Sequence, residues 1–351
     1  MTHVALAVPI NAILGASANG PVSNFPLAIS TLCTVGVNES TCPLTFHPSW
    51  TDGDRFWGVT GSVGAFACVT SSDVGLTWQQ CPTLPFVAKQ AQNIAETSNG
   101  NIVAVGDVSS VCQIRLSTDA AVSWTTVFNG TVPCTIAAKA QSLYCQPTTG
   151  QCDFGLISGG NGFIYRTTDN GLTWSETAMG AGVSVTSGGI AFDGNSGIIG
   201  GDPAFGARAL VAAGNVWGVS SPWGISSLLR GTPLLFGGAT PQMISQNGAV
   251  NEYHRTDGNG TLIQVLGTLP FGLPGFSQGL RCLYWDGSMY YCFGATTIGS
   301  GIWVTTDNFV SFITLSNTTR QVGFSTGYKL GTRLFMSFNA GGVNPTFLVI
   351  Q

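Results

Sequence analysis

The chain has 351 residues, of which only 8% are charged, and its formal net charge is −4. The 12 Lys and Arg residues do not cluster, which argues against binding to nucleic acid, because that function needs a basic patch. No uninterrupted apolar run reaches the roughly 18 residues of a membrane-spanning helix, so we expect no membrane span.

The N-terminal segment combines a weak leader-like stretch with two possible strands. Residues 4–18 read VALAVPINAILGASA and resemble a poor signal peptide, because no Lys or Arg precedes them and Pro9 and Asn11 interrupt the apolar run. We expect this stretch to be retained. Residues 3–9 or 25–33 can each supply a β-strand.

A short pattern with an Asp, a Gly and a Trp recurs further along the chain. It reads SSDVGLTW and RTTDNGLTW, with weaker copies in LSTDAAVSW, where Ala121 replaces the Gly, and in TTDNFVSF. The Asp is expected to accept hydrogen bonds from backbone N–H groups two residues on. The Gly supplies a positive φ, and the Trp adds buried area as the next strand begins. The positions that define the copies are Asp73, Gly75, Trp78, Asp119, Trp124, Asp169, Gly171, Trp174, Asp257, Asp307 and Phe312.

The spacing of these copies indicates a structural repeat. Asp119 follows Asp73 by 46 residues, Asp169 follows Asp119 by 50, and Asp307 follows Asp169 by 138. The long interval leaves room for two worn copies, RTDGNGTL and LVAAGNVW. The resulting six units have about 45–50 residues each, the length of a four-stranded propeller blade.

Each unit repeats one order of short strands, such as NIVAVGD followed by QIRLSTD, and no long stretch has a capped helical period. After the sixth unit, residues 322–330, 333–340 and 346–351 offer three more strands. We therefore predict an all-β, seven-bladed β-propeller of four-stranded antiparallel blades. It is a single domain in which residues 43–351 form the blades and residues 1–42 supply the strand that closes the ring. Six blades with an N-terminal extension is the alternative.

The repeated turns resemble the Asp-box (BNR) repeats of sialidases and related propellers. Strings such as ISGGNGFIYRTTDNGLTW are still more similar to the propellers of photosystem II assembly factors and their bacterial relatives. The resemblance covers roughly residues 45–315. It implies that the Asp boxes are structural and lie on the face opposite the usual binding site. It implies a fold and no particular function, because propellers host many unrelated activities.

The chain contains ten cysteines. Pairing of neighbours would link the first two strands of a blade or clip a hairpin that carries an Asp turn, although sequence alone leaves the connectivity open. Metal binding is the rival interpretation, but no CxxC pair exists and the three His are scattered, so we expect no metal. Five disulfides predict an extracellular or virion-surface location. The predicted pairs are Cys33–Cys42, Cys68–Cys81, Cys112–Cys134, Cys145–Cys152 and Cys282–Cys292.

The sequence does not assemble a catalytic set. A sialidase-like site would need three Arg, a Tyr–Glu pair, an acidic Asp and an F/Y-R-I-P signature, and the nearest string, DRFWG, does not match. Loops that follow second strands open onto the usual binding face, and aromatic rings there suit stacking on sugars. The alternative is that a Gly-Asp pair only ends a strand. We assign no catalytic residue, and the predicted ligand-binding residues are Asp202, Phe205, Arg208, Trp223 and Asp107.

These observations predict a non-enzymatic, surface-exposed propeller. It would act as a structural, decoration or receptor (glycan)-binding subunit, most consistent with a bacteriophage virion, with other protein subunits of a particle or cell-surface assembly and glycans as partners. No cofactor, nucleic acid or membrane is expected. One alternative is a secreted glycoside hydrolase or lectin-like carbohydrate-binding module, and another is an assembly factor.

Overall fold

The structure is a computed structural model that describes the backbone of strands between Val8 and Ile350. No helix in these described parts of the chain is long and apolar enough to cross a membrane. Side chains are described for Phe335 and for residues 43, 46–60, 67–86, 93–106, 108, 111–130, 143–155 and 163–178.

Three four-stranded sheets follow one another in the first half of the chain. In each sheet the strands lie side by side in chain order, and neighbours are antiparallel, as short connections require. The first sheet contains β3 (Thr45–Pro48), β4 (Phe56–Thr60), β5 (Ala67–Ser71) and β6 (Gln79–Gln80). The second contains β7 (Ala91–Glu96), β8 (Ile102–Val108), β9 (Val111–Ser117) and β10 (Thr125–Asn129). The third contains β11 (Tyr144–Cys145), β12 (Cys152–Ser158), β13 (Asn161–Thr167) and β14 (Ser175–Ala181).

Three further sheets repeat this order in the second half of the chain. The fourth contains β15 (Val185–Asp193), β16 (Ser196–Gly201), β17 (Leu210–Ala213) and β18 (Val216–Val219). The fifth contains β19 (Leu229–Leu234), β20 (Gln242–Asn247), β21 (Glu252–Thr256) and β22 (Leu262–Thr268). The sixth contains β23 (Leu280–Trp285), β24 (Tyr290–Ala295), β25 (Ser300–Thr305) and β26 (Ile313–Thr318).

The remaining sheet joins the two ends of the chain, in the order β1-β2-β29-β28-β27. Its members are β1 (Val8–Pro9), β2 (Ala28–Thr34), β27 (Gly323–Leu330), β28 (Arg333–Ala340) and β29 (Val343–Ile350). β2 and β29 are antiparallel, with Ile29 opposite Ile350. Of the two N-terminal candidates, residues 25–33 thus contain most of the strand beside β29.

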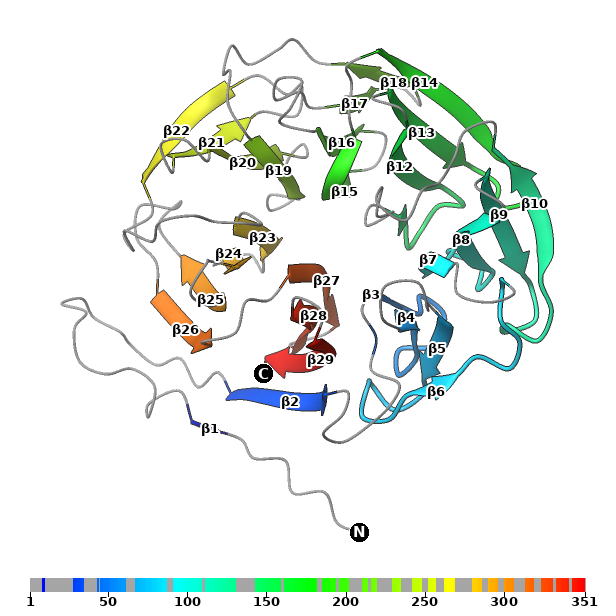
Figure 1. The fold of residues 1–351 in the computed structure, drawn as a ribbon, viewed down its shortest axis with the longest axis horizontal. Helices are drawn as coiled ribbons and strands as arrows, with labels where there is room; N and C mark the ends of the chain where they lie inside the picture. Colours follow the sequence, from blue (N-terminus) through cyan, green and yellow to red (C-terminus); the bar gives the residue numbers. More distant parts are fainter. Residues whose placement is uncertain are drawn as a thin grey trace.

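The sheets are arranged around a common centre, with their first strands innermost (Figure 1). The first strands of consecutive sheets contact each other, from β3 and β7 onward, and β27 contacts β3. Phe335 on β28 also packs edge-to-face against Phe56 on β4, with ring centroids 4.9 Å apart. The all-β class and the four-stranded antiparallel sheets of the prediction are confirmed.

Strand β8 shows why these strands are nearly continuous in apolar residues. Successive side chains of a strand point to opposite faces. Ile102 therefore joins a core cluster with Trp57 of the first sheet, whereas Val103 joins a second cluster with Phe154 of the third sheet. Because both faces of the middle sheet are packed, neither face is free to be polar. The aromatic rings of Phe154 and Tyr165 stack in the second cluster, with centroids 4.5 Å apart.

Two of the five predicted disulfides lie within the described side chains, and both are formed. Cys68 on β5 is bonded to Cys81 directly after β6, and Cys145 is bonded to Cys152 across β11 and β12. These bonds fit an extracellular protein. The other pairs stay predictions. Cys282 stands opposite Cys292 in the register of β23 and β24, whereas Cys42 and Cys134, the expected partners of Cys33 and Cys112, lie outside the described residues.

Each described turn between a third and a fourth strand contains two consecutive left-handed residues. The pairs are Val74 and Gly75 (φ 59° and 82°), Ala120 and Ala121 (55° and 66°), and Asn170 and Gly171 (57° and 86°). The positive φ expected of the Gly is confirmed in both copies that have one, and Ala121 adopts it despite its Cβ. A Cβ on Gly171 would also lie 2.9 Å from side-chain atoms of Leu116 and Val103, so this turn packs closely on the second sheet.

Replacing Val74 with Asn should raise the free energy of unfolding by about 1 kcal/mol, because a β-branched residue is strained at positive φ whereas Asn tolerates it. Asn170 already occupies the equivalent position in the third sheet. Urea denaturation measures the change. The matched control is Val122→Asn, since Val122 lies in the next turn without a positive φ. A Val74→Asn protein no more stable than the wild type would contradict this account.

Candidate functional site

Loops and turns from one end of the sheets form a continuous surface, which we call the turn face. Antiparallel strands place the first-to-second loops and the third-to-fourth turns at the same end. Backbone hydrogen bonds connect them, from Val74 N to Asp54 O and from Asn170 N to Gly150 O, each 2.8 Å. The turn face consists of loops 49–55, 97–101 and 146–151 and turns 71–78, 117–124 and 167–174.

The turn around Asp73 is closed by its own side chains. Asp73 Oδ1 accepts hydrogen bonds from Ser71 Oγ at 2.7 Å and from the backbone N–H of Thr77 at 2.9 Å, and Oδ2 accepts one from Thr77 Oγ1 at 2.6 Å. Trp78 Nε1 donates to Gly75 O at 3.1 Å. The expected backbone bond from two residues on is therefore corrected to one from four residues on. The left-handed pair of residues curls the chain so that Thr77 comes back to the carboxylate.

The turns around Asp119 and Asp169 repeat this arrangement with Ser123 and Thr173 as donors. At Asp73 and Asp169 burial raises the pKa of the carboxyl, but the hydrogen bonds outweigh it and leave the pKa below its ordinary value. At Asp119 the bonds from Ser123 dominate and also lower the pKa. The three groups are thus fixed, ionised acceptors at neutral pH, which suits a structural role and not that of an acid.

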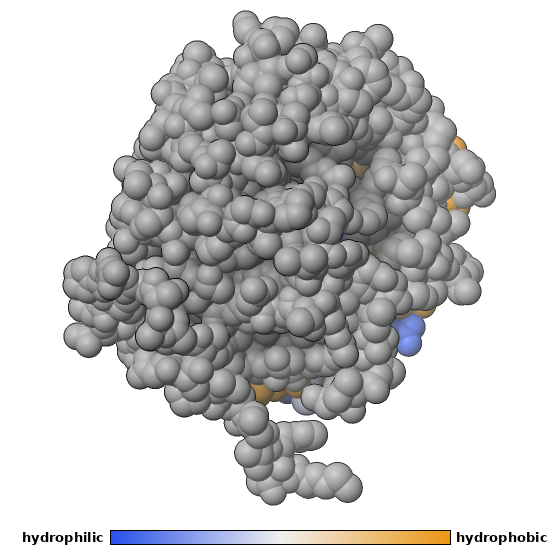
Figure 2. All heavy atoms as spheres, turned by 60° about the vertical axis from the view of Figure 1, so that its left-hand side comes forward, coloured by the Kyte–Doolittle hydropathy of each residue, from blue (hydrophilic) through white to orange (hydrophobic). Residues whose placement is uncertain are grey.

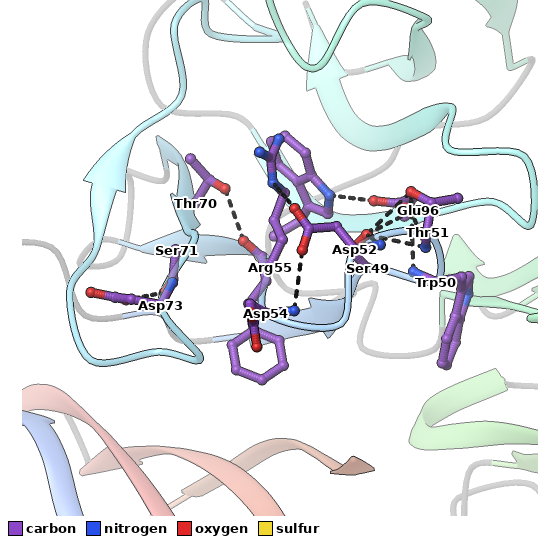
Figure 3. A network of polar contacts seen from close by, with 12 residues as sticks. Ser49, Trp50, Thr51, Asp52, Asp54, Arg55, Thr70, Ser71, Asp73 and Glu96 are labelled. Atoms are coloured by element: carbon purple, nitrogen blue, oxygen red, sulfur yellow. Dashed lines mark hydrogen bonds and ion pairs between the residues drawn. The ribbon is translucent and has the colours of Figure 1, made fainter. Parts of the chain in front are cut away.

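Glu96, at the end of β7, connects the second sheet to the loop of the first (Figure 3). The side chain of Glu96 is 2% exposed. Its Oε1 accepts hydrogen bonds from Ser49 Oγ and Thr51 Oγ1, both at 2.8 Å, and from the backbone N–H groups of Trp50 and Thr51, both at 3.1 Å. Its Oε2 accepts one from Trp57 Nε1 at 2.7 Å. Five donors from one loop and one strand therefore depend on a single side chain.

A second buried group lies in the third sheet. Arg166 Nε on β13 donates to Asp153 Oδ1 on β12 at 2.6 Å, and the two side chains are 9% and 0% exposed. Gln151 Nε2 donates to Asp153 Oδ2 at 2.9 Å. The register places Asp153 directly opposite Arg166, so this ion pair holds two adjacent strands together.

His47 on β3 lies beside the Glu96 network and is 1% exposed. Its Nδ1 is 2.7 Å from Pro48 O, to which it donates, and its ring meets that of Trp50 edge-to-face at 5.0 Å. Burial lowers the pKa of His47 to about 4, because the charged imidazole would lose its hydration. His47 is therefore neutral in the folded protein at neutral pH.

Protonation of His47 should destabilise the fold in mildly acidic solution. Its folded pKa of about 4 lies below the ordinary value of 6.5, so the unfolded chain binds more protons between these values. The stability contributed by neutral His47 is present above pH 6.5 and is lost as the pH falls toward 4, by about 3 kcal/mol. Urea denaturation at several pH values measures this slope. In His47→Asn the slope over this window should shrink, and an unchanged slope would exclude His47 as its source.

Three large apolar side chains are exposed on the turn face. Leu76, Val122 and Leu172 are 57%, 58% and 56% exposed, and each occupies the same position in its turn. Figure 2, a view from another side, shows hydrophobic and hydrophilic described residues at the edge of the molecule. Sequence analysis did not single these positions out, although the aligned copies place an apolar residue directly before each Thr or Ser of the pattern.

Most residues of the predicted ligand-binding surface cannot be placed. Asp107 lies within β8, opposite Cys112 on β9, and not in the loop that follows. Among the described residues, no three His, Cys, Asp or Glu side chains come together as a metal site. The predicted positions outside the described residues are Asp202, Phe205, Arg208 and Trp223 of the ligand-binding set and Asp257, Asp307 and Phe312 of the turns.

Comparisons with known proteins identify the fold. No protein-family model and no curated protein matches the sequence. The structure is similar to that of YCF48 from Cyanidioschyzon merolae, with a TM-score of 0.57 and 13% identity, over 90% of this chain and 98% of that chain. It is also similar to the GH74 xyloglucanase from Xanthomonas campestris, with a TM-score of 0.54 and 12% identity, over 89% of this chain and 56% of the xyloglucanase. The fold is a β-propeller, and identities this low show nothing beyond the fold.

The chemistry that the turn face offers is that of a binding surface. The carboxylates of Asp73, Asp119, Asp169 and Glu96 are all engaged in hydrogen bonds that hold loops and turns in place. What remains directed outward is acidic charge and a series of apolar side chains.

Proposed function

We propose that this chain is a non-enzymatic β-propeller that acts by binding, as a structural, decoration or receptor-binding subunit exposed on the surface of a particle, a bacteriophage virion. One observation carries the proposal. The turn carboxylates are fixed within the fold while equivalent turns of three consecutive sheets each expose a large apolar side chain. Such a surface favours contact with another macromolecule.

The proposal includes the finer architecture. The six four-stranded sheets and the sheet that joins both termini correspond to seven blades, with β2 from residues 1–42 closing the ring against β29. Pairing of β2 with β29 and contact of β27 with β3 support this arrangement. The self-bonded turns around Asp73, Asp119 and Asp169 support their assignment as Asp boxes.

The extracellular location is proposed for the complete set of five disulfides. The two bonds in the described residues support it, as does the register that sets Cys282 opposite Cys292. Disulfides persist at virus and cell surfaces and are rare in reducing compartments.

A second candidate function is that of a secreted glycoside hydrolase or lectin-like module. The similarity to a xyloglucanase favours it, together with the predicted sugar-binding residues. Aromatic side chains such as Trp223 would stack on sugars, and a hydrolase would need a pair of carboxylates, of which Asp202 would be one.

A single set of assays separates these functions. The full chain is applied to a glycan array and, in parallel, incubated with a panel of oligosaccharides while release of reducing ends is followed. We expect no hydrolysis, and any glycan binding should weaken in Trp223→Ala and persist in Asp202→Asn. Release of reducing ends that disappears in Asp202→Asn would replace the proposal with the hydrolase. The control variant is Gln80→Ala, on an exposed position of β6.

A further inference from the structure

The exposed apolar side chains of the turn face are held in fixed positions. The backbone N–H of each one donates to the carbonyl oxygen of the Asp of its own turn, at 3.3 Å for Leu76, 3.2 Å for Val122 and 3.4 Å for Leu172. The residue that follows is tied to the Asp carboxylate. Because the backbone is already ordered, binding through these side chains loses little conformational entropy.

These side chains have no evident role within the fold. The left-handed residue before each is buried, as Gly75, Ala121 and Gly171 are, and the Trp two positions later packs against the sheet or its neighbour. The apolar residue between them is more than half exposed. A single exposed Leu needs no explanation, but the same choice at one position of three consecutive sheets forms a series.

The charge around this series is acidic. Asp54 and the three turn aspartates lie on the turn face without a neighbouring Lys, and Arg55 is paired with Asp52 at 3.3 Å. Loops 97–101 and 146–151 contain no charged residue. The described part of the turn face therefore combines negative charge with evenly repeated apolar side chains.

We propose that the turn face docks a protein partner whose contacting surface carries Lys and Arg side chains interspersed with apolar ones. Charge complementarity selects this occupant. A second copy of this chain would bring one acidic face against another, and nucleic acid and anionic lipid are repelled by the same charge.

This inference rests on the proposed function, which makes the chain a subunit of an assembly, and it names the chemistry of the neighbouring subunit. The two fail differently. Release of sugars from oligosaccharides would overturn the proposed function without affecting peptide binding. Absence of peptide binding would overturn the docking surface and leave a receptor-binding subunit intact.

The test uses the full chain and three synthetic amphipathic helical peptides of equal length, composed of Leu and Lys, Ser and Lys, or Leu and Glu. Calorimetry measures each dissociation constant at low and moderate salt. We expect the Leu–Lys peptide to bind at least about tenfold more tightly than the others, and more weakly as salt rises. In the triple variant Leu76→Thr, Val122→Thr, Leu172→Thr this preference should be lost.

The matched control is the triple variant Gln80→Ala, Thr126→Ala, Thr177→Ala, whose positions are exposed on the outer strands of the same sheets and whose binding should equal that of the wild type. Hydrogen exchange on the wild type gives an independent measurement, with protection by the Leu–Lys peptide expected at residues 73–77, 119–123 and 169–173. Equal binding of all peptides, unchanged binding by the Leu-to-Thr variant, or protection elsewhere only would overturn the proposal. So would a wild-type dimer that this variant dissociates, since the occupant would then be a second copy.

Discussion

Replacement of Glu96 with Ala is expected to lower the free energy of unfolding by about 4 kcal/mol. The substitution removes the acceptor for five donors, among them Ser49 Oγ, the backbone N–H of Trp50 and Trp57 Nε1. Each buried donor left without a partner costs about 1–3 kcal/mol, and water entering the space recovers part of this. Urea denaturation, with the midpoint and slope fitted together, measures the loss.

The control for this prediction is Asp54→Ala in the loop that Glu96 holds. Asp54 is exposed, and its contact with the turn is made by its backbone carbonyl, so the change should stay within about 0.5 kcal/mol. Glu96→Gln retains one acceptor oxygen but turns its amide nitrogen toward a donor, and we expect an intermediate loss. If Glu96→Ala and Asp54→Ala had equal effects, the network would not stabilise the contact between the first two sheets.

Replacement of Asp153 with Ala is expected to cost about 3–5 kcal/mol. The variant would leave the Arg166 guanidinium buried beside an empty site, and removal of one partner from a buried ion pair has effects of this size. Gln151 would lose its acceptor as well. The same denaturation measurement applies, and the loss should exceed that of any exposed carboxylate on the turn face.

A double-mutant cycle tests whether the cost of Asp153→Ala comes from the ion pair. Arg166→Ala alone should also be strongly destabilising, and the double variant should be more stable than the sum of the two single effects predicts. Additive effects would show that the two strands are held by other contacts. The ion pair would then contribute nothing measurable, despite its distance of 2.6 Å.

The repeated turns could be predicted from sequence because their hydrogen bonds are local. Asp73, Gly75 and Trp78 lie within one short segment, and both Gly in the described copies have the expected positive φ. The partner of the carboxylate was wrong by two residues. Val74 also adopts a left-handed conformation, which a β-branched residue rarely does, and this second residue changes the path of the chain.

The contacts between sheets could not be predicted in this way. Glu96 binds residues 39–47 positions earlier in the sequence, and no local pattern marks a Glu at the end of a strand as an acceptor for another blade. The ion pair of Asp153 and Arg166 depends on strand register, which the sequence leaves open until both strands are placed.

The candidate site illustrates a different limit. Attention to the carboxylates of the turns was justified, but the apolar residue beside them was treated as part of a hydrophobic pattern. Only the structure shows that Leu76, Val122 and Leu172 point to solvent, because burial in a propeller depends on which strands of neighbouring sheets cover a turn.

The measurement that tests the proposed function most directly is the native mass of the protein after gentle purification from its source, with its neighbours identified by mass spectrometry. The account predicts a stoichiometric complex with other protein subunits of a particle, in which a basic subunit cross-links to residues of turns 71–78, 117–124 and 167–174. Recovery as a free monomer that hydrolyses oligosaccharides would contradict it.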